Sequence, residues 1–282
     1  MELELLAWGY GLVEGPRTDE AGNLYFSDIT GGGVFRRSPD GELETLIPGR
    51  PSVGGLALHA DGGLVVSGPE VAHWKDGELR VLLSAEGVSA WNDLQPDGAG
   101  NIYAGCIRSD MSDMSDLKGP KVPGELWRIG VDGSTREVYG GVEISNGIGF
   151  SPDGGTIYHS DSMSKGIWAH DIDADGNVSN RRHLGRAVFE RGIPDGMCVD
   201  VDGNLWVAHV GGRRVAKLDP QGNLIDEVPV PAKWVTSVAF GGADWDELYL
   251  VTSDNLDDVD KKGSIFRARP GVKGVPTPLA RV

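Results

Sequence analysis

Oxygen-bearing side chains recur at one register of this 282-residue sequence. Glu14, Asn92 and Asp195 each lie 10 residues before a hydrophobic residue of a repeated strand pattern, and Asn146 lies 11 residues before one. Carboxylate and amide oxygens are the ligands that Ca²⁺, Mg²⁺ and Mn²⁺ prefer, and mixed sites of this type also accept Zn²⁺ or Fe²⁺. The four residues therefore predict a site for one divalent metal ion. The alternative is that each group is separately hydrogen-bonded at the end of its own strand.

The remaining two repeats carry small residues at this register. Gly54 and Ser237 occupy the equivalent positions and would leave room around a bound ion or substrate. Without a cation, Glu14 and Asp195 would face each other, and like charges in a partly desolvated site are costly. Two carboxylates would balance the charge of one divalent ion.

The register follows from a repeated unit of a turn and a strand, which occurs six times. The strand anchors are spaced by 40, 38, 55, 48 and 43 residues, mostly the length of one four-stranded propeller blade. A Gly-containing turn and a further strand follow each anchor strand, and Pro or Gly interrupts every potential long helix. The anchors are Leu24, Leu64, Ile102, Ile157, Leu205 and Leu248. We expect an all-β, six-bladed β-propeller with four-stranded antiparallel blades.

A propeller is a closed ring, so one chain end must complete the last blade. Either ELELLAWG (2–9) or PTPLARV (276–282) could supply its outer strand and leave no blade edge unpaired. Closure predicts a single domain over residues 1–282. The spacing of 55 places an insertion at 108–124 in the third repeat, and such loops are often functional, although a surface excursion without a role is the alternative.

The charge balance excludes several classes of partner. Lys and Arg number 26 and Asp and Glu number 42, which gives a formal net charge of −16. This acidity argues against nucleic acids and against anionic membrane surfaces, because both are bound through basic surfaces. We find no signal peptide and no apolar run long enough to span a membrane, so we expect a soluble, cytoplasmic protein. We expect a monomer or a weak homo-oligomer.

Several longer stretches resemble the SMP-30/gluconolactonase/luciferin-regenerating-enzyme family of metal-dependent lactonases, which have a six-bladed propeller fold. The matching segments are VEGP (13–16), WNDLQPDGAGNIYAG (91–105), SNGIGFSPDGGTIYHSDS (145–162), GNVSNRRHL (176–184), IPDGMCVDVDGNLWVAHVGG (193–212) and TSVAFGGADWDELYLVTS (236–253). The order and spacing of the NGIGFSPDG and PDGMCVDVDGNLWVA segments make the resemblance specific. An isolated SPDG turn would not, because it occurs in unrelated propellers.

The resemblance implies roles for individual residues. Glu14, Asn146 and Asp195 would bind the divalent metal, and Asp195 would also act as the general base. Asn92 would contact the substrate or complete the metal sphere through water. The implied reaction is hydrolysis of a sugar lactone, such as an aldonolactone, to its hydroxy acid.

The sequence also departs from the family pattern near Asn92. Ala90 stands where the family often carries an arginine that contacts sugar hydroxyls. Trp91 could line a more apolar pocket, with a core position as the alternative, and His209 is the histidine expected to reach the pocket. The substrate could therefore be another lactone, an aryl ester or an organophosphate, and a non-catalytic binding propeller is a further alternative.

Overall fold

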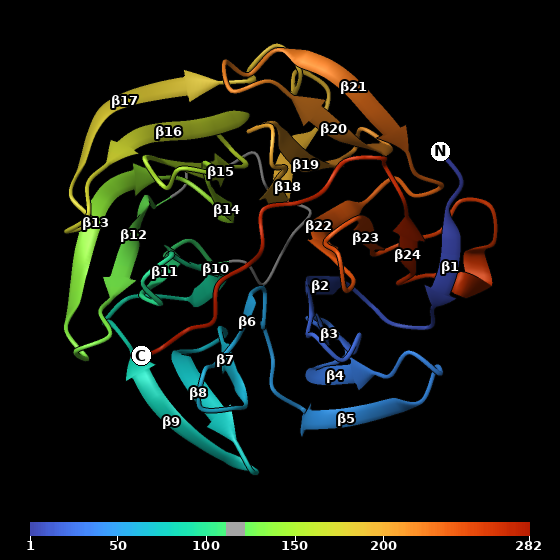
Figure 1. The fold of residues 1–282 in the computed structure, drawn as a ribbon, viewed down its shortest axis with the longest axis horizontal. Helices are drawn as coiled ribbons and strands as arrows, with labels where there is room; N and C mark the ends of the chain where they lie inside the picture. Colours follow the sequence, from blue (N-terminus) through green and yellow to red (C-terminus); the bar gives the residue numbers. More distant parts are fainter. Residues whose placement is uncertain (111–121) are drawn as a thin grey trace.

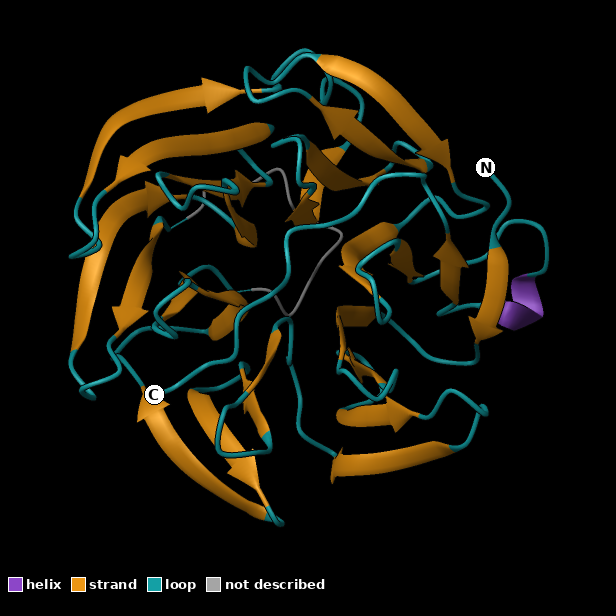
Figure 2. Ribbon diagram, in the orientation of Figure 1, coloured by secondary structure: helices purple, strands orange, loops and turns teal. Residues whose placement is uncertain are grey.

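Six four-stranded antiparallel sheets surround a common axis in the computed structural model, which describes residues 1–110 and 122–282 (Figure 1). The expected six-bladed β-propeller is confirmed. The only helix in the described residues is a short 3₁₀ turn, η1 (Val259–Lys261), at the periphery of the ring (Figure 2). None of the helical structure described is long and apolar enough to cross a membrane.

Each blade is ordered from an inner strand near the axis to an outer strand at the rim. The first three blades consist of β2 (Val13–Thr18), β3 (Leu24–Asp28), β4 (Gly33–Arg37) and β5 (Leu43–Pro48); β6 (Leu56–Leu58), β7 (Leu64–Val66), β8 (Val71–Lys75) and β9 (Glu78–Leu83); and β10 (Ala90–Pro96), β11 (Ile102–Ile107), β12 (Gly124–Ile129) and β13 (Thr135–Val142). The other three consist of β14 (Ser145–Phe150), β15 (Thr156–Asp161), β16 (Gly166–Ile172) and β17 (Val178–Leu184); β18 (Ile193–Val199), β19 (Leu205–Val210), β20 (Arg214–Leu218) and β21 (Leu224–Pro229); and β22 (Val235–Gly241), β23 (Glu247–Thr252), β24 (Ile265–Ala268) and β1 (Glu4–Ala7).

The N-terminal strand closes the ring. β1 pairs with β24, and Glu4 forms an ion pair with Arg267 at 2.7 Å. The C-terminal candidate does not form an outer strand. Instead, it crosses the face of the ring, where Gly274 bridges to Asp200 and Ala280 bridges to His59 (Figure 1).

Burial decreases from the axis to the rim. Every residue of β2, β19 and β22 is buried, whereas the outer strands β5 and β21 are mostly exposed. Between blades, apolar side chains of the first and second strands pack against each other. For example, Trp206 of β19 meets Phe240 of β22 edge-on, with 5.6 Å between ring centroids. This packing fixes the inner strands, and their first residues surround one mouth of the axis.

Aspartate-based turns connect the inner strand to the second strand of several blades. In the turn at 200–204, Asp200 Oδ1 accepts hydrogen bonds from the backbone N–H groups of Asp202 and Asn204, and Gly203 has a φ of +85°. The same Asp-to-Asn contact over four residues recurs at Asp19 and at Asp97. Part of the acid excess therefore serves the turns of the repeat.

Candidate functional site

The four polar residues of the repeated register lie in one cavity of about 340 Å³ at the mouth formed by the starts of the inner strands. Glu14 lies near the start of β2, Asn92 near that of β10, Asn146 near that of β14 and Asp195 near that of β18. Side chains separated by 181 residues are thereby brought to a common site.

Local irregularities in the strands direct these side chains toward the axis. The pairing of inner and second strands shifts register between Glu14 and Arg17, Trp91 and Leu94, Ser145 and Ile148, Pro194 and Met197, and Val235 and Ser237. Such bulges leave residues unpaired and re-orient their side chains. Asn92, Asn146 and Asp195 lie inside the shifted segments, and Glu14 lies at the edge of one. The register shift thus occurs at the level of the site in five of the six blades.

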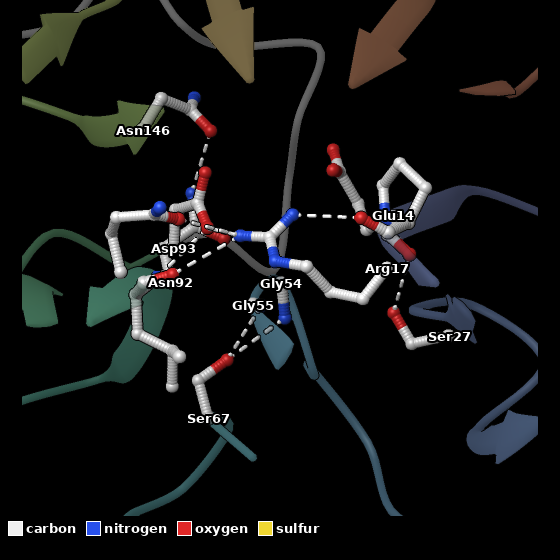
Figure 3. A network of polar contacts seen from close by, with 12 residues as sticks. Glu14, Arg17, Ser27, Gly54, Gly55, Ser67, Asn92, Asp93 and Asn146 are labelled. Atoms are coloured by element: carbon white, nitrogen blue, oxygen red, sulfur yellow. Dashed lines mark hydrogen bonds and ion pairs between the residues drawn. The ribbon is translucent and has the colours of Figure 1, made fainter. Parts of the chain in front are cut away.

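Hydrogen bonds join three blades at the floor of the cavity. Asn92 Nδ2 donates to Asn146 Oδ1 at 2.9 Å and to the Ser145 carbonyl at 2.7 Å (Figure 3). Asn146 Nδ2 donates to Ser162 Oγ at 2.9 Å, and Ser162 in turn donates to the Pro194 carbonyl at 2.7 Å. The two amides are therefore held in fixed orientations.

The two carboxylates of the cavity are buried. Glu14 is 6% exposed and Asp195 is 8% exposed. Burial raises the pKa of both groups well above their usual values, and repulsion adds to this for Glu14 from Asp195 and for Asp195 from Asp93. A divalent cation bound by these groups would offset both the desolvation and the repulsion.

Asp93 and Arg17 are residues of this region that the sequence reasoning missed. Burial raises the pKa of Asp93 to about 6, although Arg17, 3.9 Å away, opposes the shift. Arg17 also donates to the carbonyls of Pro16 and Leu94, while its buried Nε has no hydrogen-bond partner (Figure 3). The sequence held a signal for Asp93, because a charged residue follows Asn92 whereas glycine follows four of the five other register residues, namely Glu14, Gly54, Asn146 and Asp195.

The donor set fits a hard divalent metal ion. Glu14 and Asp195 supply carboxylate oxygens, and Asn146 and Asn92 supply amide oxygens. No group of three or more His, Cys, Asp or Glu side chains suited to a metal occurs among the described residues, so an ion at this site would depend on the amides.

The structure corrects the expected position of Trp91. Its side chain is fully buried and packs edge-on against Trp127 at 6.2 Å between ring centroids, in the core between blades. The physical reason is strand alternation, since consecutive residues point to opposite faces and Asn92 takes the face toward the axis. Trp91 does not line the cavity.

His209 is also displaced from its expected position. It lies on β19, the second strand of its blade, and is 2% exposed. Its Nε2 lies 2.9 Å from the Arg191 carbonyl, Arg214 Nε donates to its Nδ1 at 3.2 Å, and Phe189 packs against its ring. Both nitrogens are therefore engaged within the blade, and the side chain does not line the cavity.

Of the other residues near the predicted site, some line the cavity and some do not. Ala90 lines the cavity, as do Ser162 and Thr236, which the sequence reasoning did not single out. Gly54 and Ser237 do not line the cavity, and the space beside Gly54 is taken by Asn92, whose Oδ1 would lie 2.0 Å from a Cβ at Gly54. Most of the 108–124 insertion lies outside the described residues.

Comparison with known proteins shows the family of the chain. The sequence model of the SMP-30/gluconolactonase/LRE-like region matches residues 12–254. Regucalcin of Xenopus laevis is 34% identical, covering 96% of this chain and 95% of its own length. The 6-deoxy-6-sulfogluconolactonase of Pseudomonas putida is 34% identical, covering 91% and 90%. A solved luciferin-regenerating enzyme superposes with a TM-score of 0.88 at 29% identity, covering 100% and 99%. The chain belongs to the SMP-30/gluconolactonase/LRE-like family.

Proposed function

We propose that the protein is a metal-dependent lactonase that opens a sugar lactone to the corresponding hydroxy acid. The observation that carries the proposal is the convergence of two buried carboxylates and two oriented amides in one cavity. The relative from Pseudomonas putida, named for its action on a gluconolactone derivative, supports a lactone as the substrate. The partner of the site is thus a small molecule.

Glu14, Asn146 and Asp195 would hold the metal, with Asn92 beside them. A bound divalent ion would act as a Lewis acid toward the lactone carbonyl and would stabilise the negative charge that develops on its oxygen. Asn92 and Asn146 would orient the substrate, because their amides are fixed by the hydrogen bonds that cross the blades.

Asp195 is the proposed general base. A water oxygen attacks the carbonyl carbon while the Asp195 carboxylate accepts one of the water protons. When the bond between the carbonyl carbon and the ring oxygen breaks, the same proton passes from Asp195 to the ring oxygen. The product is a hydroxy acid, and water is the only co-reactant.

The experiment is acid release at constant pH from a panel of lactones, with the chelated protein and with Ca²⁺, Mg²⁺, Mn²⁺, Zn²⁺ or Fe²⁺ restored singly. We expect metal-dependent hydrolysis of at least one lactone and its loss, about 1,000-fold or more, in Asp195→Asn. The exposed turn aspartate in Asp202→Asn is the matched control and should leave the rate unchanged. Absence of metal-dependent acid release from every lactone would refute the proposal.

An aryl-ester or organophosphate hydrolase is the second candidate. It is favoured by Ala90, which brings a methyl group rather than a charged side chain to the cavity wall. The same assay decides between the two, because activity restricted to esters or phosphotriesters would favour this alternative.

A further inference from the structure

The cavity has a polar floor and a largely apolar wall. The layer next to this floor is formed by the residues two positions before Glu14, Gly54, Asn92, Asn146, Asp195 and Thr236. Those positions carry Leu12, Ser52, Ala90, Ile144, Ile193 and Trp234, and all six line the cavity. Four of the six are large apolar side chains.

The second strands add a further apolar group to the same wall. Ile107 and Val210 are the last residues of β11 and β19, and Ile29 and Met163 follow β3 and β15 by one and two residues. Ile29 and Met163 are only half-buried. Large apolar side chains that remain partly exposed around a polar site indicate a surface that an apolar ligand group covers.

The polar groups of the wall offer little to a hydroxyl-rich or anionic ligand. The hydroxyl residues of the lining are Ser52, Thr30, Ser162 and Thr236. Ser162 and Thr236 donate to backbone carbonyls, and Thr30 Oγ1 accepts a hydrogen bond from the Leu12 N–H at 3.0 Å. The described lining includes no lysine, arginine or histidine, and its charged groups are Glu14 and Asp195. A sulfonate or phosphate substituent would meet no cation among these residues.

We propose that the preferred substrate is a lactone whose ring carries an apolar alkyl or aryl substituent. The ester group would meet the floor, and the substituent would lie against Ile144, Ile193 and Trp234. This inference rests on the proposed lactonase activity. It keeps the lactonase chemistry and narrows the proposed sugar lactone to a deoxygenated or alkylated ring in place of a fully hydroxylated one.

The first test compares metal-dependent kcat/KM for three six-membered lactones, each divided by its uncatalysed rate. They are δ-valerolactone, the same ring with a propyl substituent, and glucono-1,5-lactone. We expect the propyl compound to exceed both others by about 10-fold or more, because each buried methylene contributes roughly fourfold. If glucono-1,5-lactone ranks first, this inference fails while the proposed function stands. If no lactone is hydrolysed, the proposed function fails.

Binding supplies a readout that does not depend on catalysis. Calorimetry with the corresponding unreactive lactams, in metal-loaded and metal-free protein, should show the propyl lactam binding about 10-fold more tightly than the unsubstituted one. Equal affinities for the two lactams would overturn the inference, whatever the hydrolysis rates.

Variants of the wall test the position of the substituent. Met163→Gln and Ile193→Thr conserve approximate size and add polarity, and each should reduce the preference for the propyl compound about threefold or more. Val131→Thr changes an exposed apolar residue that does not line the cavity and should leave the preference unchanged. Folded Met163→Gln and Ile193→Thr proteins that both keep the full preference would contradict the proposal.

Discussion

At the scale of single residues, the site combines groups that are unfavourable in isolation. Glu14 and Asp195 are buried with raised pKa values, and Asp93 adds a third carboxyl nearby. Arg17 is a cation that acts on Glu14 and Asp93, but it lies beside Asp93 and bonds mainly to carbonyl oxygens. Binding of the proposed cation would recover the free energy that these groups lose by desolvation.

Removal of one carboxylate should therefore raise the free energy of unfolding of the metal-free protein and lower that of the metal-loaded protein. We expect Glu14→Gln and Asp195→Asn to raise the free energy of unfolding of the chelated protein by about 1 kcal/mol, because a buried like charge is removed. Both should lose the stabilisation by metal, which is about 2.7 kcal/mol at 100 times the Kd. Thermal unfolding with and without each metal measures both effects.

Asp202→Asn is the control for this pair, since Asp202 is exposed in a turn. It should retain the full stabilisation by metal. A metal-induced increase in Tm that survives in both Glu14→Gln and Asp195→Asn would show that the ion binds elsewhere.

His159 should make the stability of the folded protein depend on pH. It is fully buried between the Tyr139 hydroxyl, 2.8 Å from its Nδ1, and Ser145 Oγ, 2.7 Å from its Nε2. Burial lowers its pKa to about 4, from about 6.5. The unfolded chain therefore binds more protons between these values, so His159 should reduce stability as the pH falls from about 6.5 to 4.

His159→Gln should remove this contribution, which is on the order of 3 kcal/mol over the interval. Its loss of buried hydrogen bonds should add a destabilisation that does not vary with pH. The measurement is denaturant unfolding of both proteins at several pH values, and the difference between them should shrink as the pH falls. A difference that stays constant would show that His159 is not neutral in the folded protein.

At the scale of elements, the inner strands position the site through glycines as well as bulges. Gly54 lies opposite Asn92, and its missing side chain accommodates the Asn92 amide oxygen. Gly196 follows Asp195, and a Cβ there would lie 2.1 Å from Ser237 Oγ. The neighbouring inner strands can approach each other at these positions only because no side chain intervenes.

Gly54→Ala should therefore impair the site. The added methyl group would displace Asn92 and break its hydrogen bond to Asn146, so we expect kcat/KM to fall about 100-fold. Gly98→Ala is the matched control, because its added Cβ meets no atom within 4 Å. Equal activity of the two variants in the lactonase assay would show that the position of Asn92 does not matter.

At the scale of the whole molecule, ring closure ties the two ends of the sequence together. β1 joins residues near position 4 to residues near position 267, and Leu5 packs into the core between the last two blades. Because each blade contacts two neighbours, loss of one edge should destabilise the entire ring. We infer that residues 1–282 form one domain and unfold in a single transition.

Deletion of residues 1–8 should lower the free energy of unfolding by about 3 kcal/mol or more, because it exposes the edge of β24 and part of the core. Glu4→Ala removes only the exposed ion pair with Arg267 and should cost less than about 1 kcal/mol. Chemical denaturation followed by both fluorescence and circular dichroism measures these changes. Separate transitions for the two probes in the intact protein would contradict the single domain.

The repeat in the sequence determined the fold, because strand length, turn chemistry and spacing are local properties. The same repeat brought Glu14, Asn92, Asn146 and Asp195 into one register, and a ring converts a shared register into proximity. The identity of the closing strand was left open between the two ends, because both carry suitable apolar residues and only pairing with β24 selects between them.

The tertiary structure alone decided which neighbours of these residues reach the site. Trp91 and His209 are suitable in type but face the core or bond within a blade, since strand alternation and bulges set the direction of each side chain. Asp93 and Arg17, far apart in the sequence, approach each other only because their inner strands surround the same axis. The apolar wall likewise became visible only when the ring placed residues from different blades around one cavity. Sequence spacing fixes which level of the ring a residue occupies, whereas packing between blades fixes what it touches.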